Sequence, residues 1–513
     1  MGQETELKLE VSRQATRRLV ASRWLKKLAC GPIQTKRLVS VYYDTDGMTL
    51  RDKQSMLRVR RIDGRFVQTF KAPAAGAMSR LEWEVPIRGP KPDLHDARKK
   101  DTGGFNLRKL RKFLKPIFET NVSRRIVPIR YHGIRLELAV DQGQVKTGRH
   151  RLPINEIELE LKNGRPGVIV ALAERLAGEL DAAFGVASKA ERGYALREAE
   201  LDQPVHASPI ILSPQMPAAD AFEAIAMSCL HHFAANRRAV MAKRSEGVHQ
   251  MRVGLRRLRA TLTLFKEMLR GPQTEHIEAE LKWLTEELGP ARDMDVLIEE
   301  AIDPLLVSAE PGPARILKTD IATRRDDGFA RAGAAVRSDR YRLVVLHAAF
   351  WIMGGSWRKS RIDLAIARRN MPVRDFAARE LARRAAKVVK RLDKIEGLNP
   401  RRRHKLRIAI KKLRYGVEFF ASLYDGKRMK RRRKKFAAVL KALQSSLGKL
   451  NDIRVHRVLA GRYADPKRCR RFAAPKAFAM GLLSGRERSH VRALMKAARR
   501  DGTRLSRCRP FWK

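Results

Sequence analysis

Cysteine is scarce in this chain of 513 residues, and its four cysteines lie far apart without a Cys-x-x-Cys pair. This distribution argues against a thiolate zinc site and a disulfide framework, and it fits a reducing cytoplasm. Long apolar runs are also missing, because the longest, LVVLHAAFWIMGG from Leu343, is too short to span a membrane and contains a histidine. The first residues show no basic-then-apolar signal segment. We therefore expect a soluble, cytoplasmic protein with no membrane partner.

Acidic residues are few relative to basic ones. The chain has 55 Asp and Glu against 109 Lys and Arg, which gives a formal charge of +54 and a pI near 11.1. Such an excess predicts an extended polyanion as partner. Residues 401–513 hold 36 of the Lys and Arg and only six Asp and Glu, so the charge is concentrated there. Aromatic residues make up only 6% and form no RNA-binding motif, which argues against nucleic acid as that polyanion.

The chain divides into two parts of different character. Residues 1–202 contain alternating patterns closed by Asp-Gly, Gly-Pro, Gln-Gly and Asn-Gly turns, which predict an antiparallel meander or barrel, with a helix over 168–185 that ends at Gly185. Four prolines within residues 203–217 predict a linker. Residues 218–513 show helical spacing almost throughout, so we expect an α+β multidomain protein whose second domain is all-helical.

Charged residues follow the strand period in the first part. In ETELKLEV, the residues Glu4, Glu6 and Lys8 share one face of a strand, and Leu7 and Leu9 share the other. The same alternation recurs in NEIELELKNG, LRVRR, QTFK and SRLEWE. It fits either solvated outer faces or the charged interior of a closed sheet, and the residues alone leave both open. A charged interior would need a ligand, because carboxylates suit Mg²⁺ or Mn²⁺ and clustered Lys and Arg suit phosphate oxygens.

ETELKLEV resembles the ExExK signature of the CYTH, or triphosphate tunnel metalloenzyme, superfamily. The likeness continues through VYYDT, LRVRR, QTFKAP, SRLEWE, LAVDQG, NEIELELKNG and SKAERGY, over about residues 3–198. The resemblance implies an eight-stranded antiparallel tunnel that hydrolyses inorganic triphosphate with Mg²⁺ or Mn²⁺.

The same resemblance implies roles for the residues at matching positions. It makes Glu4, Glu6, Glu158 and Glu160 metal ligands, and it makes Glu4, Glu6 and Lys8 catalytic. It gives the binding of phosphate to Arg58, Arg60, Lys71, Arg80, Arg124, Lys162 and Lys189, and it adds Glu82, Glu84, Glu137 and Asp141 to the lining. Arg124 and Arg125 are adjacent, so only one can point inward, and we assign Arg124.

The helical part contains an internal repeat. The segments VHQMRVGLRRLR and RHKLRIAIKKLR lie 155 residues apart, and each is followed by a second similar segment, LTEELGPARDMDVL or LQSSLGKLNDIRVH. On a helix, the four polar positions of each copy fall within an arc of about 80°. This stripe could line a groove for a polyanion, or it could be a solvated face whose histidines contact Asp293 and Asp452. The stripe consists of His249, Arg252, Arg256 and Arg259 in one copy, and His404, Arg407, Lys411 and Arg414 in the other.

This repeat resembles the CHAD family, the conserved histidine α-helical domain, over about residues 218–510. The resemblance implies a helical bundle with two related halves that binds inorganic polyphosphate through the eight stripe residues, with a cytoplasmic location that extends to polyphosphate granules. Two other functions stay open: a non-catalytic polyphosphate-binding or targeting protein, and a tunnel enzyme acting on thiamine triphosphate or a nucleotide.

Overall fold

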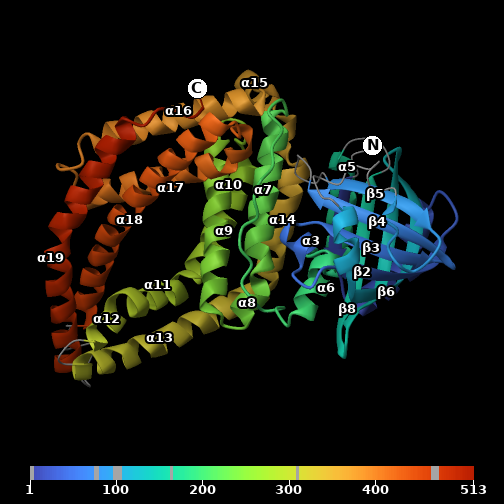
Figure 1. Cartoon of the computed structure of the whole chain (residues 1–513), viewed down its shortest axis with the longest axis horizontal. Coiled ribbons are helices and arrows are strands. Elements are labelled where there is room, and N and C mark those ends of the chain that lie inside the picture. Colours follow the sequence, from blue (N-terminus) through green and yellow to red (C-terminus); the bar gives the residue numbers. More distant parts are fainter. Residues whose placement is uncertain are drawn as a thin grey trace.

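The computed structural model describes residues 5–73, 80–95, 107–161, 166–307, 311–463 and 473–512. An antiparallel sheet forms one end of the molecule, and a large helical region forms the other (Figure 1). The predicted α+β fold, with a sheet domain followed by an all-helical domain, is confirmed. Among the described helices, none combines the length and apolar character that a membrane crossing requires.

The sheet contains nine strands in the described part of the chain, in the order β5-β4-β3-β2-β6-β7-β8-β1-β9, and the paired strands are antiparallel. Eight of them are long, and β9 has only two residues. Their bounds are β1 (Thr5–Glu10), β2 (Gln34–Asp44), β3 (Met56–Ile62), β4 (Arg65–Pro73), β5 (Arg80–Ile87), β6 (Lys115–Tyr131), β7 (Ile134–Thr147), β8 (His150–Leu161) and β9 (Ala183–Phe184).

The sheet wraps round so that distant strands face each other. Burial raises the pKa of Glu6 on β1, and the positive charge of Lys71 on β4 opposes this rise, although six strand spacings separate the two strands. In a flat sheet these strands would be about 29 Å apart, beyond the reach of a screened charge. The charged face is therefore the inner one. The outer face carries the buried Leu7 and Leu9, which pack in the main hydrophobic cluster with residues of the covering helices.

Short helices border the sheet, and α5 and α6 follow it in sequence. They are α1 (Arg13–Ala21), α2 (Arg23–Leu28), α3 (Thr49–Asp52), α4 (Leu107–Leu110), α5 (Pro166–Leu180) and α6 (Lys189–Arg197). The predicted helix over 168–185 is wrong at its C-terminal end. Asp181 adopts a left-handed conformation (φ 48°), which Asp tolerates, and Phe184 then pairs with β1 as part of β9. Ala183 and Phe184, which the helical periodicity assigned to this helix, therefore lie at the edge of the sheet instead.

The helical region repeats one arrangement of helices. Its helices are α7 (Ala218–Ala235), α8 (Arg237–Met241), α9 (Ser245–Leu264), α10 (Pro272–Glu287), α11 (Gly289–Leu297), α12 (Asp303–Leu306), α13 (Pro311–Arg337), α14 (Asp339–Gly354), α15 (Asp363–Asn370), α16 (Val373–Leu392), α17 (Pro400–Phe419), α18 (Lys427–Tyr463) and α19 (Ala473–Ser506). In the first copy α9 precedes α10 and α11, whereas in the second α17 precedes the single long α18. Pro290 lies where the second copy has Lys449, and its missing N–H fits a helix start after Leu288.

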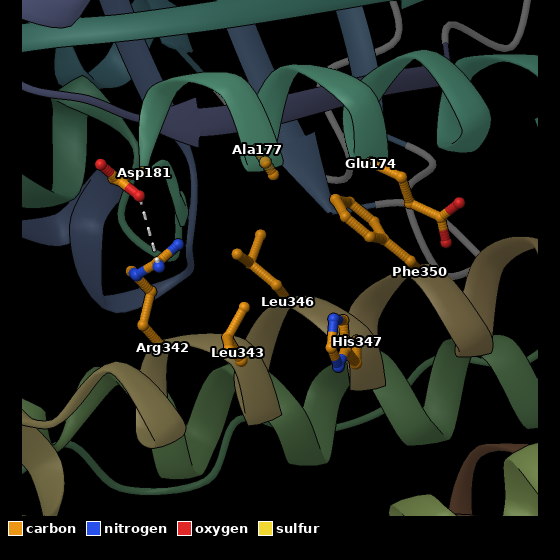
Figure 2. A pocket seen from close by; sticks show the side chains of 9 residues that line it. Glu174, Ala177, Asp181, Arg342, Leu343, Leu346, His347 and Phe350 are labelled. Carbon is orange, nitrogen blue, oxygen red and sulfur yellow. Dashed lines mark ion pairs between the residues drawn. The ribbon is translucent and has the colours of Figure 1, made fainter.

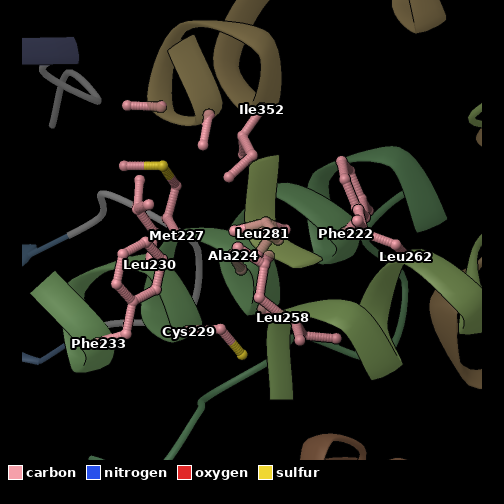
Figure 3. Close-up of a cluster of buried hydrophobic side chains, with 14 of the residues drawn as sticks. Phe222, Ala224, Met227, Cys229, Leu230, Phe233, Leu258, Leu262, Leu281 and Ile352 are labelled. Atoms are coloured by element: carbon pink, nitrogen blue, oxygen red, sulfur yellow. The ribbon is translucent and has the colours of Figure 1, made fainter. Parts of the chain in front are cut away.

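The core of the helical region joins α7 to its neighbours. Phe222 and Leu230 of α7 lie beside Leu258 of α9, Leu281 of α10 and Ile352 of α14 (Figure 3). Helices α7 and α9 approach closely at Gly254, where an added Cβ would lie 2.7 Å from the Cβ of Phe233. A side chain at position 254 would therefore push the two helices apart.

The two parts of the molecule pack on each other through α5 and α14. Arg342 donates a hydrogen bond to the carbonyl of Ala182 at 3.1 Å and contacts Asp181 at 3.7 Å. A cavity of about 390 Å³ lies beside this contact, with Leu346 and Phe350 on its α14 side (Figure 2). The main hydrophobic cluster runs through this contact without a break, so the sheet and the helical region share one core.

Candidate functional site

Three carboxylates converge on the inner face of the sheet. Asp141 on β7 lies opposite Glu156 on β8, and Glu158 is two residues further along β8. One oxygen from each of the three lies within 4.8 Å of the others. Asp141 and Glu156 are completely buried. We call Asp141, Glu156 and Glu158 the carboxylate cluster.

Lys189 and Arg124 each contact more than one carboxylate of this cluster. The Nζ of Lys189 lies 2.7 Å from Asp141 Oδ2 and 2.8 Å from Glu158 Oε1, and it also donates to Glu156. Arg124 donates from Nε and from a terminal nitrogen to the two oxygens of Asp141, at 2.8 and 2.7 Å, and it also contacts Glu158. Such bidentate, charge-assisted contacts are among the strongest in proteins.

Two more cations complete the surroundings of the cluster. Lys8 Nζ lies 3.2 Å from Glu158 and 3.7 Å from Glu156, and Arg192 contacts Glu156. Lys8 passes close to Gly185, where an added Cβ would lie 2.5 Å from its Cγ. Among the described residues, three carboxylates are thus paired with four cations.

These contacts shift the pKa values of the cluster. Burial disfavours the charged form of Glu158, yet Lys189, Lys8 and Arg124 together hold its pKa well below the ordinary value. Burial also opposes the charge of Lys189, but Glu158 and the other two carboxylates raise its pKa. Glu158 and Lys189 are therefore ionised at neutral pH, and their charges hold each other in place.

Helix α6 positions two of the four cations. Ser188 caps it through a capping box with Glu191, which fixes the first turn, and Lys189 and Arg192 lie three residues apart on one face. Further along, the Tyr194 hydroxyl donates to Asp44 at 2.9 Å. Asp44 is itself held by backbone N–H groups from the start of α3. Tyr194 and neighbouring apolar residues of β2 and β6 fill one end of the inner face.

A second set of carboxylates lies along the same strands. Glu6 on β1 pairs in register with Glu160 on β8, and Glu160 pairs with Glu137 on β7. Burial raises the pKa of Glu6, and the negative charge of Glu158 raises it further. An additional cation beside Glu6 would therefore be favourable.

The opposite wall of the sheet is basic. Arg58 donates to Thr69 at 3.2 Å and contacts Glu84 at 3.3 Å, and Arg60 donates to Ser40 at 3.1 Å. Burial and the neighbouring charge of Arg58 lower the pKa of Arg60 to about 10. Lys71 pairs with Glu82 at 2.5 Å. The guanidinium groups on this wall repel one another, and a bound anion would relieve that repulsion.

The residues named from the sequence fall into three groups. Glu6, Lys8, Arg58, Arg60, Lys71, Arg124, Glu158, Glu160 and Lys189 are described as above. Glu4 and Lys162 lie outside the described residues, and Arg80 begins β5 with a side chain that is also outside them. The predicted metal ligands did not include Glu156, Asp141 was named only as part of the lining, and Arg192 was not named. The alternation in NEIELELKNG puts Glu156 on the same strand face as Glu158. The three-residue spacing in SKAERGY puts Arg192 on the same helix face as Lys189, so the sequence indicated both residues.

In the helical region the two basic stripes face each other. Burial lowers the pKa of both Arg407 and Lys411 on α17, and the positive charge of Arg256 on α9 lowers it further. Burial is the larger cause for Lys411, whose pKa falls to about 7. Four arginines of the two stripes have a buried Nε atom without a hydrogen-bond partner among the described residues; these are Arg252, Arg256, Arg407 and Arg414. We call these four arginines and Lys411 the basic cluster.

The acids near the basic cluster are few. Arg252 lies 3.7 Å from Asp293, and Asp452 acts on Arg407 and Lys411. His404 shares a hydrogen bond of 2.8 Å with Asn451. In the first copy Arg292 lies at the position of Asn451. Burial lowers the pKa of His249, and the charge of Arg292 lowers it further. The two halves therefore differ next to their histidines, and Arg259 is exposed at the margin.

The fold and these sites define a class of protein: an antiparallel tunnel with a charged interior, joined to a helical bundle with two related halves. Residues 2–194 match the CYTH domain and residues 224–461 match the CHAD domain. The chain therefore contains a CYTH domain and a CHAD domain.

Two curated proteins and one solved structure are similar to this chain. An inorganic triphosphatase of Haemophilus influenzae is 33% identical over 206 residues, which are 38% of this chain and 55% of that protein. An uncharacterized protein of Mycobacterium tuberculosis is 33% identical over 35% of each chain. The crystal structure of the CHAD domain from the plant Ricinus communis is 27% identical, with a TM-score of 0.51, and covers 58% of this chain and 96% of that one. The chain thus matches about half or less of the length of these two curated relatives.

Proposed function

We propose that the sheet domain hydrolyses inorganic triphosphate with a divalent metal, and that the helical domain binds inorganic polyphosphate. The observation that carries the first part is the carboxylate cluster, which faces the basic wall of Arg58 and Arg60 across one inner face. The CYTH match and the triphosphatase relative support the same chemistry. A small substrate with several phosphates suits such a site because it can contact the acids through a metal and the bases directly.

The carboxylates fit a hard divalent ion. Oxygen donors that converge within 4.8 Å are the ligands that Mg²⁺ and Mn²⁺ prefer. Glu158 would hold the ion together with Asp141 or Glu156, and Glu6 and Glu160 on the same strands are further candidate ligands. Glu4 is proposed as a ligand from the sequence alone. When bound, the ion supplies a Lewis acid for the phosphate oxygens.

The cations of the chain have the complementary role. Arg58, Arg60 and Arg124 would grip phosphate oxygens and stabilise the charge that develops as the phosphoanhydride bond breaks. Lys8 would act beside Glu158, from which it is 3.2 Å away. Lys71, Arg80, Lys162 and Lys189 are further phosphate contacts proposed from the sequence.

Phosphate release from inorganic triphosphate tests this function directly. With Mg²⁺ or Mn²⁺ we expect release of phosphate that stops on chelation of the metal. The rate should exceed that from ATP, thiamine triphosphate or pyrophosphate, because the site has many cations to contact three phosphates and no group is assigned to bind a nucleobase or thiamine. No release with either metal, from folded protein that still binds polyphosphate, would contradict the enzyme and leave a polyphosphate-binding protein. A preference for an organic triphosphate would change the substrate alone.

Polyphosphate binding is proposed for the basic cluster of α9 and α17. Its buried Nε donors have no partner among the described residues and its cations repel one another, and both properties suit an anion-binding site. Competition between polyphosphate and DNA of matched charge separates this function from nucleic-acid binding, since both weaken as salt rises. Displacement of polyphosphate by DNA at equal charge would contradict it.

Lys411 predicts a pH dependence for this binding. Its pKa of about 7 means that it loses its proton as the pH rises above neutrality, whereas a bound phosphate favours the charged form. Binding should therefore take up a proton, and the affinity for polyphosphate should fall by up to about tenfold per pH unit above pH 7. Titrations at several pH values measure this slope. Lys411→Arg should flatten it and Lys405→Arg, on the same helix, should not; equal slopes in all three proteins would refute the assignment.

A further inference from the structure

We infer that Lys189 is a built-in counter-cation of the carboxylate cluster, which admits a divalent metal only together with a phosphate substrate that draws the lysine away. This inference rests on the proposed function and adds an order of binding to it. Lys189 would then couple the binding of the metal to the binding of the substrate, and it would also contact the phosphate of that substrate.

The position of Lys189 is that of a bridging cation. Its Nζ reaches an oxygen of each of the three carboxylates, which come from two neighbouring strands. An ammonium group has three N–H donors, so these three acceptors satisfy it completely. The side chain is 11% exposed, so little water competes for these contacts. A metal that used the same three oxygens would have to displace this ammonium group.

The local charge leads to the same conclusion. With Lys8, Arg124 and Arg192 also in contact, the cluster is already neutralised by the described side chains. A divalent ion on the same oxygens would add two positive charges to a buried cluster whose described cations already outnumber its carboxylates, so it would need further negative charge beside it. A triphosphate supplies that charge and offers Lys189 new acceptors. Metal and substrate should therefore bind with strong mutual dependence.

The movement that this exchange needs is small. Helix α6 is fixed by its capping box and by the hydrogen bond from Tyr194 to Asp44. Lys189 is the first residue of α6, and its four-carbon side chain can swing while the helix stays in place. Lys189 can therefore exchange carboxylate oxygens for phosphate oxygens without unfolding any element.

Mn²⁺ binding to the full chain, measured by calorimetry without triphosphate, tests the inference. We expect wild type to bind Mn²⁺ weakly, and Lys189→Met and Lys189→Gln to bind it at least about tenfold more tightly, because the three carboxylate oxygens are then no longer held by the ammonium group of Lys189. Lys115→Met is the control with the same change in charge, since Lys115 on β6 is exposed and pairs with the exposed Asp46, away from the carboxylate cluster. Thermal melting gives a second readout: Mn²⁺ should raise the melting temperature of the Lys189 variants more than that of wild type.

The outcomes separate this inference from the proposed function. If wild type hydrolyses triphosphate but the folded Lys189 variants bind Mn²⁺ no more tightly than wild type, the order of binding is overturned and the enzyme remains. If Lys115→Met gains as much affinity as the Lys189 variants, general charge rather than Lys189 is responsible, and the inference also fails. If wild type releases no phosphate while only the Lys189 variants gain Mn²⁺ affinity, the triphosphatase function fails and Lys189 is still the counter-cation.

Discussion

Replacing Glu158 with glutamine should reduce phosphate release from triphosphate by roughly 100- to 1000-fold. The substitution keeps the size of the side chain but removes the charge that Lys8, Arg124 and Lys189 share. It also removes a ligand from the proposed metal position. Initial rates at saturating triphosphate and Mg²⁺ or Mn²⁺ measure the loss. Addition of excess metal should not restore the rate, because the oxygen donor itself has changed.

Glu119→Gln is the matched control for this experiment. Glu119 lies on β6 next to the inward Phe118, so its side chain is on the other face of the same sheet. We expect it to retain activity close to that of wild type. Circular dichroism during heating shows whether Glu158→Gln still folds, since three cations lose part of their compensation. A folded Glu158→Gln protein with more than about a tenth of the wild-type rate would contradict the proposed site.

The double change Arg256→Ala and Arg407→Ala should weaken polyphosphate binding by about 100-fold or more. Each arginine offers a buried Nε donor without a partner in the described ranges, and a hydrogen bond to a charged group contributes about 1.5–3 kcal/mol. Arg256 acts on Arg407 from the other helix, so both would contact one bound chain. Titration with polyphosphate at fixed salt and pH measures the change. Loss of two phosphate contacts should also make binding less sensitive to salt.

A control with the same change in net charge separates a site from general attraction. Arg331→Ala with Arg340→Ala removes two positive charges from the surface, where these arginines pair with Glu287 and Glu280. We expect this pair to change polyphosphate affinity by less than about threefold, because exposed paired charges contribute little. Equal weakening in both double variants would show that the total charge of +54, rather than the basic cluster, determines binding.

Local patterns along the chain account for much of the fold. Alternation with a period of two is set by neighbouring residues, so strands such as Thr5–Glu10 could be predicted directly. The repeat and the helical spacing likewise predicted two related halves. The helix that ends at Leu180 was predicted too long because pairing of β9 with β1 is a contact between distant residues. No local signal in residues 181–185 records that pairing.

By itself, the sequence determined the fold class, the excess of positive charge and the set of charged residues that share a strand face or a helix stripe. Only the tertiary structure decided that the charged strand face points inward, since that depends on which face the helices cover and on how the sheet wraps round. It also brought Asp141, Glu156 and Glu158 together with Lys189 from α6, and it brought Arg256 opposite Arg407 and Lys411. The physical reason is that periodicity is local, whereas register, closure and helix packing are properties of segments far apart in the chain.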